Sequence, residues 1–195
     1  EEFDAVFDEL AGALGTIRDA YDALLARHAK IHGELMGRVS FSLGAPEADR
    51  ALSTDVLNEK ALDAPEPHAQ IERAFQAGRY TIISSTGVRP PNIVGLWAAN
   101  WRPPFRGAYT ANGNMQVAMQ FLQMGSTPEL MLSYFDWLEE RMPGYRESCR
   151  LLYGIDSWHL PAQSTTTAED HHWFYLHPHL YWYGGSPWAC LFYYD

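Results

Sequence analysis

Apolar residues recur at helical spacing along much of the chain. Between residues 3 and 36 they follow three-and-four spacing, which predicts one long amphipathic helix, or two helices if Gly12 and Gly15 interrupt it. The same spacing predicts a helix over about 67–84. It predicts a further helix over about 113–124, which ends where a glycine follows.

The next helix carries an explicit start signal. Thr127, Pro128 and Glu129 combine a capping hydroxyl, a proline at the first helical position and an acid in the positive first turn. Pro143 then either kinks this helix or begins the next one. A last apolar run, 188–195, predicts the opening of another helix.

The intervening segments have no sustained periodicity. Residues 39–43 alternate between apolar and polar, which predicts a short strand or an extended segment. Residues 44–67 read as a connecting loop with at most one short helix, and 87–110 and 153–187 as irregular loops. The predicted fold class is therefore mostly α, with long irregular loops rich in aromatic residues.

Composition narrows the classes of function. The chain has 195 residues and a formal net charge of −10, so it holds one domain or two small ones and repels phosphate backbones. Two cysteines exclude a disulfide-rich scaffold and a cysteine-based zinc module, and no apolar run is long enough to span a membrane. We therefore predict no nucleic-acid partner and no membrane partner. Because the last apolar run has no stop signal, we also expect the chain to be truncated at its C-terminal end.

The densest polar and aromatic stretch, 97–114, predicts a sugar site. Flat rings suit the apolar faces of sugars, while amide and hydroxyl side chains orient hydrogen bonds to sugar hydroxyls. Asn112 and Asn114 stand two residues apart at a helix start, with Gly113 allowing a turn between them. Two interpretations are open: one asparagine caps the helix, or both contact a ligand.

A second polar group lies in the late loop. Five histidines fall between 159 and 179, beside Glu169 and Asp170, and suggest a metal site. No H-E-x-x-H motif is present, and the alternative is that these rings pack among aromatic neighbours or contact sugar. The polar loop 163–167 either lines a pocket or merely turns. We predict no metal and no cofactor, and the chain offers no convincing pair of carboxylates for glycoside hydrolysis.

Several short motifs in order resemble glycoside hydrolase family 95, the inverting α-L-fucosidases and related α-L-galactosidases. The resemblance covers about 15–195. It rests on a set of segments with the family's order and spacing: Arg38–Gly44, Gly78–Tyr80, Ile82–Ser85, Pro91–Trp97, Pro103–Pro104, Tyr109–Thr110 and the Asn112-x-Asn114 pair.

The resemblance implies a large multidomain enzyme with an (α/α)6 catalytic barrel. Residues 1–65 would then be a helical linker, and 66–195 the first part of the barrel, incomplete at the C-terminal end. The chain's substrate would be an oligosaccharide or glycan, and its other partner the rest of the parent polypeptide. The resemblance also implies secretion or export to the periplasm, which is common in the family.

The resemblance also assigns roles to residues. Asn112 and Asn114 match the pair that holds the sugar and the attacking water, so they are the predicted catalytic residues. A general acid Glu and an activating Asp are expected beyond residue 195. The remaining predicted substrate-binding residues are Trp97, Trp101, Tyr109, Thr110, His171 and His172.

The chain departs from the family pattern at several positions. It has Ala98 where asparagine is typical, Phe105 where tryptophan is typical, and Gly113 where a bulky apolar residue is typical. The family's His-His-Asn-Thr-Asp segment is not reproduced. These departures put the identity of the sugar in question, and they motivate an alternative: a non-catalytic carbohydrate-binding protein on the same scaffold.

Overall fold

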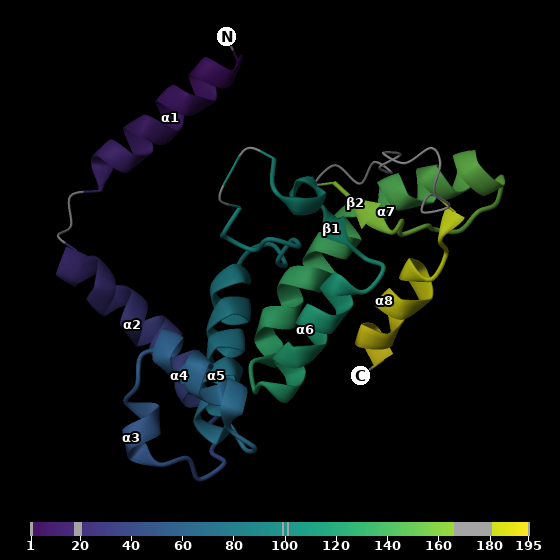
Figure 1. The fold of residues 1–195 in the computed structure, drawn as a ribbon. Helices are drawn as coiled ribbons and strands as arrows, with labels where there is room; N and C mark the ends of the chain where they lie inside the picture. The colour runs from purple at the N-terminus through teal and green to yellow at the C-terminus, as the bar shows by residue number, and fades with distance from the viewer. Residues whose placement is uncertain (1, 18–20, 99, 101, 166–180, 195) are drawn as a thin grey trace. The chain divides into compact units, whose positions relative to one another are not determined.

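The computed structural model describes residues 2–17, 21–98, 100, 102–165 and 181–194. The chain divides into two compact units, 1–37 and 38–195. The first contains helix α1 (Glu2–Thr16) and helix α2 (Tyr21–Gly37), drawn in purple in Figure 1. The long apolar repeat is thus two helices, although Gly12 and Gly15 both lie inside α1.

The apolar stripe of α1 faces outward. Val6, Phe7, Leu10 and Leu14 each keep more than half of their surface exposed. Helix α2 likewise buries none of its residues. Their periodicity therefore marks an amphipathic surface rather than a core contact of this unit.

The second unit holds the remaining elements. Its helices are α3 (Glu47–Arg50), α4 (Thr54–Asp63), α5 (His68–Ser85), α6 (Asn114–Met124), α7 (Leu132–Tyr153) and α8 (Gly185–Tyr194). The described part of this unit also contains two 3₁₀ turns, η1 (Pro104–Gly107) and η2 (Pro128–Met131), and two short strands, β1 (Tyr109–Thr110) and β2 (Gln163–Ser164). The prediction of a mostly α fold is confirmed. No helix in the described residues is long and apolar enough to cross a membrane.

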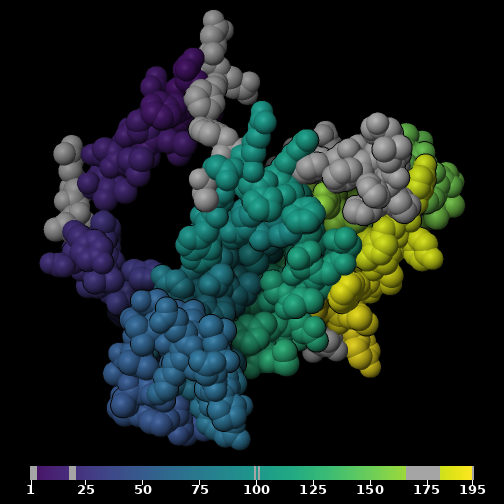
Figure 2. Space-filling view, viewed as in Figure 1, coloured from purple at the N-terminus to yellow at the C-terminus, as the bar shows by residue number. Residues whose placement is uncertain are grey.

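The core of this unit lies where α6, α7 and α8 meet. Figure 1 shows α6 between α5 and α8, and Figure 2 shows these elements packed into one body from blue to yellow. Their inward faces bury one continuous cluster, which includes Met115, Met119, Leu122, Tyr134, Trp137, Leu138, Ala189 and Phe192. The three-and-four spacing in α6 and α7 is therefore the spacing of a buried face.

A buried carboxylate on α5 fastens the segment before it. Glu72 accepts hydrogen bonds from the backbone N–H groups of Leu43 (2.6 Å) and Ala45 (3.3 Å), and from Nε of Arg50 (2.8 Å). These bonds from Arg50 and the backbone hold the pKa of Glu72 down to about 2, against an ordinary 4.5. The described segment 38–46 pairs with no strand. The carboxylate of Glu72 instead accepts hydrogen bonds from backbone N–H groups that a neighbouring strand would otherwise pair.

Two details of the predicted helices are wrong. Residues 44–67 contain two helices, because α4 buries Leu57 against Ala45 and Ala69. Thr127 stands at the N-cap position of η2, as predicted, but its hydroxyl makes no capping bond there and instead donates to the carbonyl of Leu122 (3.2 Å), in the last turn of α6. Helix α7 runs unbroken past Pro143 to Tyr153.

Candidate functional site

Two loops meet above the start of α6. Strands β1 and β2 pair antiparallel, with Tyr109 opposite Ser164 and Thr110 opposite Gln163. The ladder is extended by the N–H of Ala111, which donates to the carbonyl of Ala162 (2.8 Å). The turn that carries the two asparagines is therefore tied to a loop about fifty residues away in sequence.

The second loop is itself anchored to the core. The hydroxyls of Tyr145 and Ser164, both fully buried, lie 2.8 Å apart and share a hydrogen bond. The hydroxyl of Ser186, in α8, accepts from the N–H of Leu160 (2.9 Å) and donates to the carbonyl of Trp158 (3.2 Å). Helices α7 and α8 thus fix the loop against which the asparagine turn rests.

Asn112 and Asn114 lie on an exposed turn. Helix α6 begins at Asn114, and Gly113 precedes it with φ of 153° and ψ of −55°. The N-cap position belongs to Gly113, and no side chain makes a capping hydrogen bond. The capping interpretation is therefore wrong, and both amide side chains are exposed at the surface.

Directly behind the turn lie buried polar groups. Gln116 is 1% exposed, and its Nε2 donates to the carbonyl oxygen of Ala111. Its Oε1, and the hydroxyl of the buried Thr110, have no hydrogen-bond partner among the described residues. Unpaired buried polar groups are costly, and two of them flank the turn that carries the exposed amide pair.

Tyr109 is part of the core rather than of the surface. Its ring packs against Trp137, with 4.9 Å between centroids, and burial raises the pKa of its hydroxyl. Arg89 and Arg141 lie near it and share the carboxylate of Glu140. These hydrogen bonds, led by those from Arg89, lower the pKa of Glu140 to about 2.

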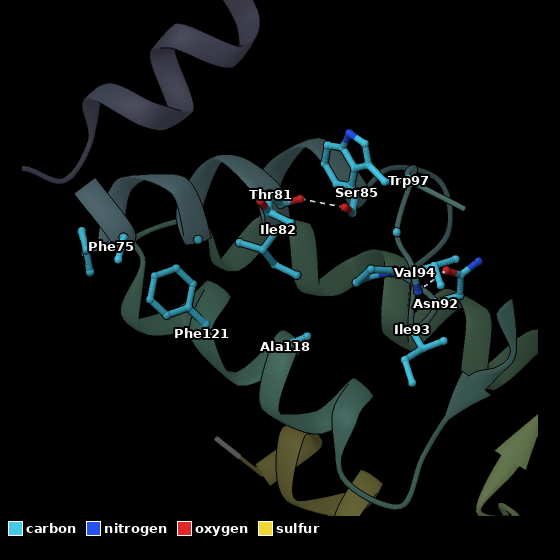
Figure 3. Close-up of a pocket in the computed structure, with 14 residues that line it drawn as sticks. Phe75, Thr81, Ile82, Ser85, Asn92, Ile93, Val94, Trp97, Ala118 and Phe121 are labelled. Atoms are coloured by element: carbon cyan, nitrogen blue, oxygen red, sulfur yellow. Dashed lines mark hydrogen bonds between the residues drawn. The ribbon is translucent and has the colours of Figure 1, made fainter. Parts of the chain in front are cut away.

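Trp97 belongs to a different feature, a cavity of about 500 Å³ between α5, the 91–97 loop and α6. Figure 3 shows Phe75, Ile82 and Phe121 lining the same hollow, with Trp97 at its loop side. Within the loop, Oδ1 of Asn92 accepts from the N–H of Val94 (3.0 Å). The cavity lining includes none of the residues of the asparagine turn.

The structure thus brings together part of the predicted site. Tyr109, Thr110, Asn112 and Asn114 share one segment, whereas Trp97 lines the separate apolar cavity. The three other predicted substrate-binding residues, Trp101, His171 and His172, lie outside the described residues. The sugar contacts proposed for all of these side chains remain predictions.

Most of the predicted histidine cluster also falls outside the described residues. His159, which is described, is 2% exposed and packs edge-on against Tyr153, with 5.4 Å between ring centroids. The placement of His159 therefore agrees with the alternative that these rings pack among aromatic neighbours. In the described ranges, no three histidine, cysteine or carboxylate side chains are grouped in a way that would hold a metal ion.

Gln116 was not singled out from the sequence. Tyr145, the hydrogen-bond partner of Ser164 in the polar loop, was not singled out either. One signal was present for Gln116: it is a polar residue between Met115 and Met119, on the face of a predicted helix that is otherwise apolar. A polar group on such a face needs an internal partner. No local signal predicts the pairing of Tyr145 with Ser164.

The chain is similar in sequence to known glycoside hydrolases. A sequence model of the glycosyl hydrolase family 95 catalytic domain matches residues 20–195. The chain is 30% identical over 155 residues to probable alpha-fucosidase A of Aspergillus niger, across 76% of this chain and 19% of that protein. It is 26% identical over 144 residues to alpha-L-fucosidase 2 of Arabidopsis thaliana, across 71% of this chain and 17% of that protein. The chain spans about a fifth of the length of these curated relatives.

Proposed function

The chain belongs to glycosyl hydrolase family 95, and from this premise we propose that its full-length protein removes terminal α-L-fucosyl or α-L-galactosyl residues from glycans with inversion. The mostly α-helical fold agrees with part of an (α/α)6 barrel preceded by a helical linker. The names of the relatives in Aspergillus niger and Arabidopsis thaliana favour fucose as the sugar.

One observation carries the proposal: two exposed amide side chains, free of any capping role, on a turn that two loops hold in place. An amide can accept a hydrogen bond through its oxygen and donate through its nitrogen. On this turn, Asn112 and Asn114 can offer donors and acceptors to a sugar hydroxyl and to a water molecule. Their support by paired backbone limits the entropy lost when substrate binds.

Inversion requires a single displacement by water, with an acid on the opposite side of the sugar. In the proposed mechanism, Asn114 orients the water and Asn112 fixes the sugar. An amide is too weak a base to take the proton alone, so a carboxylate must accept it as the C–O bond forms. A carboxylic acid protonates the departing glycosidic oxygen. We assign both of these groups to parts of the full-length protein outside this chain.

The test is turnover of an aryl α-L-fucoside by the full-length protein. We expect Asn114→Ala to lower kcat by about 100-fold or more, since it removes the group that orients the nucleophile. The melting temperature should hardly change, because the side chain is exposed and caps nothing. Asn58→Ala, an exposed asparagine in α4, is the matched control and should retain full activity.

Two results would contradict the assignment: full activity in Asn114→Ala, or loss of its folded structure. If the well-folded wild-type protein releases no sugar from fucosides or galactosides yet binds them saturably, the alternative of a non-catalytic carbohydrate-binding protein replaces the hydrolase.

A further inference from the structure

Gln116 occupies an unusual place for a polar residue. It lies in the first turn of α6, two residues after Asn114, and is 1% exposed. Its neighbours along the same buried face are Met115 and Met119, which are 3% and 0% exposed. A glutamine in such a position costs free energy unless its amide is used.

The side-chain amide of Gln116 forms a hydrogen bond with the turn that carries the two asparagines. Nε2 of Gln116 donates to the carbonyl oxygen of Ala111, the residue immediately before Asn112. The N–H of Ala111 donates in the opposite direction, to the carbonyl of Ala162 (2.8 Å). Ala111 is fully buried, so both of its backbone groups depend on these partners. The peptide groups on either side of Ala111 are thereby fixed.

The hydrogen bond between Gln116 and Ala111 also joins the first turn of α6 to the residue that follows β1. Helix α6 starts at Asn114, and its first turn is formed by the N–H of Val117 donating to the carbonyl of Gly113 (3.0 Å). Gln116 is part of that turn and reaches back across Asn112 to the end of β1. It therefore couples the helix that carries Asn114 to the strand that leads into Asn112.

From this geometry we propose that Gln116 is a positioning residue of the proposed fucosidase, holding the 111–113 turn so that Asn112 and Asn114 face the same sugar. The inference rests on the proposed function of the asparagine pair. Gln116 itself is buried beneath the turn, so it acts through the backbone rather than on the substrate.

The first test compares two variants of the full-length protein with the wild type. Gln116→Met keeps the length of the side chain and removes the donor, and we expect kcat to fall by roughly 10- to 100-fold, the effect of a small misplacement of reacting groups. Gln120→Met, an exposed glutamine of the same helix, is the control and should match the wild type.

Gln116→Glu gives a readout that a purely structural role would not change. A protonated carboxyl group can donate to the carbonyl of Ala111, and an ionised one cannot. The ratio of its kcat to that of the wild type should therefore rise as pH falls. The same ratio for Gln116→Met should stay flat, because methionine does not titrate.

Hydrogen exchange of the 111–114 backbone amides makes the test independent of turnover. We expect faster exchange in Gln116→Met than in Gln120→Met. Unchanged exchange, activity within twofold of the wild type in Gln116→Met, or a flat pH ratio in Gln116→Glu would each overturn the positioning role. A wild-type protein that is inactive on fucosides, with faster exchange in Gln116→Met, would instead refute the proposed function and leave the effect on the turn established.

Discussion

At the scale of single residues, the site depends on the conformation of Gly113. Its φ of 153° lies in a region that residues with a Cβ atom rarely adopt, and no heavy atom lies within 4 Å of where a Cβ would be placed. A side chain there would be strained without being crowded. The conformation of the turn between the two asparagines therefore depends on a glycine at this position.

We therefore expect Gly113→Ala to destabilise the full-length protein by about 1–3 kcal/mol and to lower fucosidase activity. Gly78→Ala is the control: Gly78 lies inside α5, its added Cβ would meet nothing within 4 Å, and the change should be neutral or stabilising by up to about 1 kcal/mol. Denaturant titration measures both values. Equal stability of the two variants would show that the strain is absent.

At the residue scale, the sequence singles out the two asparagines, whose roles at a sugar stay predictions. Asn112 and Asn114 stand out in the sequence because amides two apart across a glycine suggest convergence, and the structure shows both exposed on one turn. Gln116 and Tyr145 act through partners distant in the chain or hidden in the backbone. The polar position of Gln116 on an apolar helix face indicates that a partner is needed but not which one, and the pairing of Tyr145 with Ser164 leaves no local pattern at all.

At the scale of elements, hydrogen bonds to the carboxylate of Glu72 join α5 to the segment 42–50, and we call this group of bonds the Glu72 clasp. Its side chain is 9% exposed and accepts from Arg50 and from two backbone N–H groups. Arg73 adds a bond from Nη2 to the carbonyl of Arg50 (2.7 Å). The ionised carboxylate of Glu72 therefore stabilises the fold in this region.

The clasp predicts a specific response to acid. The pKa of Glu72 in the folded protein is about 2, below its ordinary 4.5, because Arg50 and the backbone donate to the ionised form. Its contribution to stability is complete above about pH 4.5 and is lost as pH falls from there toward 2. Glu72→Gln should be less stable than the wild type at pH 7 and lose less stability across this interval.

Thermal melts of the full-length protein between pH 7 and 3 check this prediction, with Glu59→Gln, an exposed residue of α4, as the control. If the melting temperatures of Glu72→Gln and the wild type fall in parallel with pH, the clasp does not link protonation to folding.

Elements with strong periodicity or clear stop residues were predicted well. Helices α5 and α6 match their predicted ranges closely, because each buries one face and α6 ends where Gly125 follows. Helix α4 gives only a weak signal in the sequence, because a single buried residue, Leu57, anchors it. Strands β1 and β2 have two residues each, too few for any alternating pattern, so only their distant pairing defines them.

At the scale of the whole molecule, large apolar side chains remain uncovered. In 1–37 they follow the stripe of α1, and in 38–195 they include Trp97 beside the apolar cavity. Apolar surface of this extent promotes association. The expected boundary between linker and barrel at residue 65 remains a prediction, since the compact units divide at 37 and 38.

We accordingly expect the 195-residue chain, produced alone, to self-associate and to melt without a cooperative transition. Sedimentation velocity and calorimetry measure these properties. A monodisperse monomer with a sharp two-state melt would show that the exposed apolar faces need no further cover.

The stereochemistry of hydrolysis reports how water reaches the sugar, because attack by one oriented water inverts the anomeric centre. Proton NMR during the first minutes of hydrolysis of an aryl α-L-fucoside by the full-length protein distinguishes the two anomers before they interconvert. We predict that β-L-fucose appears first and the α anomer follows by mutarotation. Initial release of α-L-fucose would indicate a covalent intermediate and would contradict the role assigned to Asn112 and Asn114.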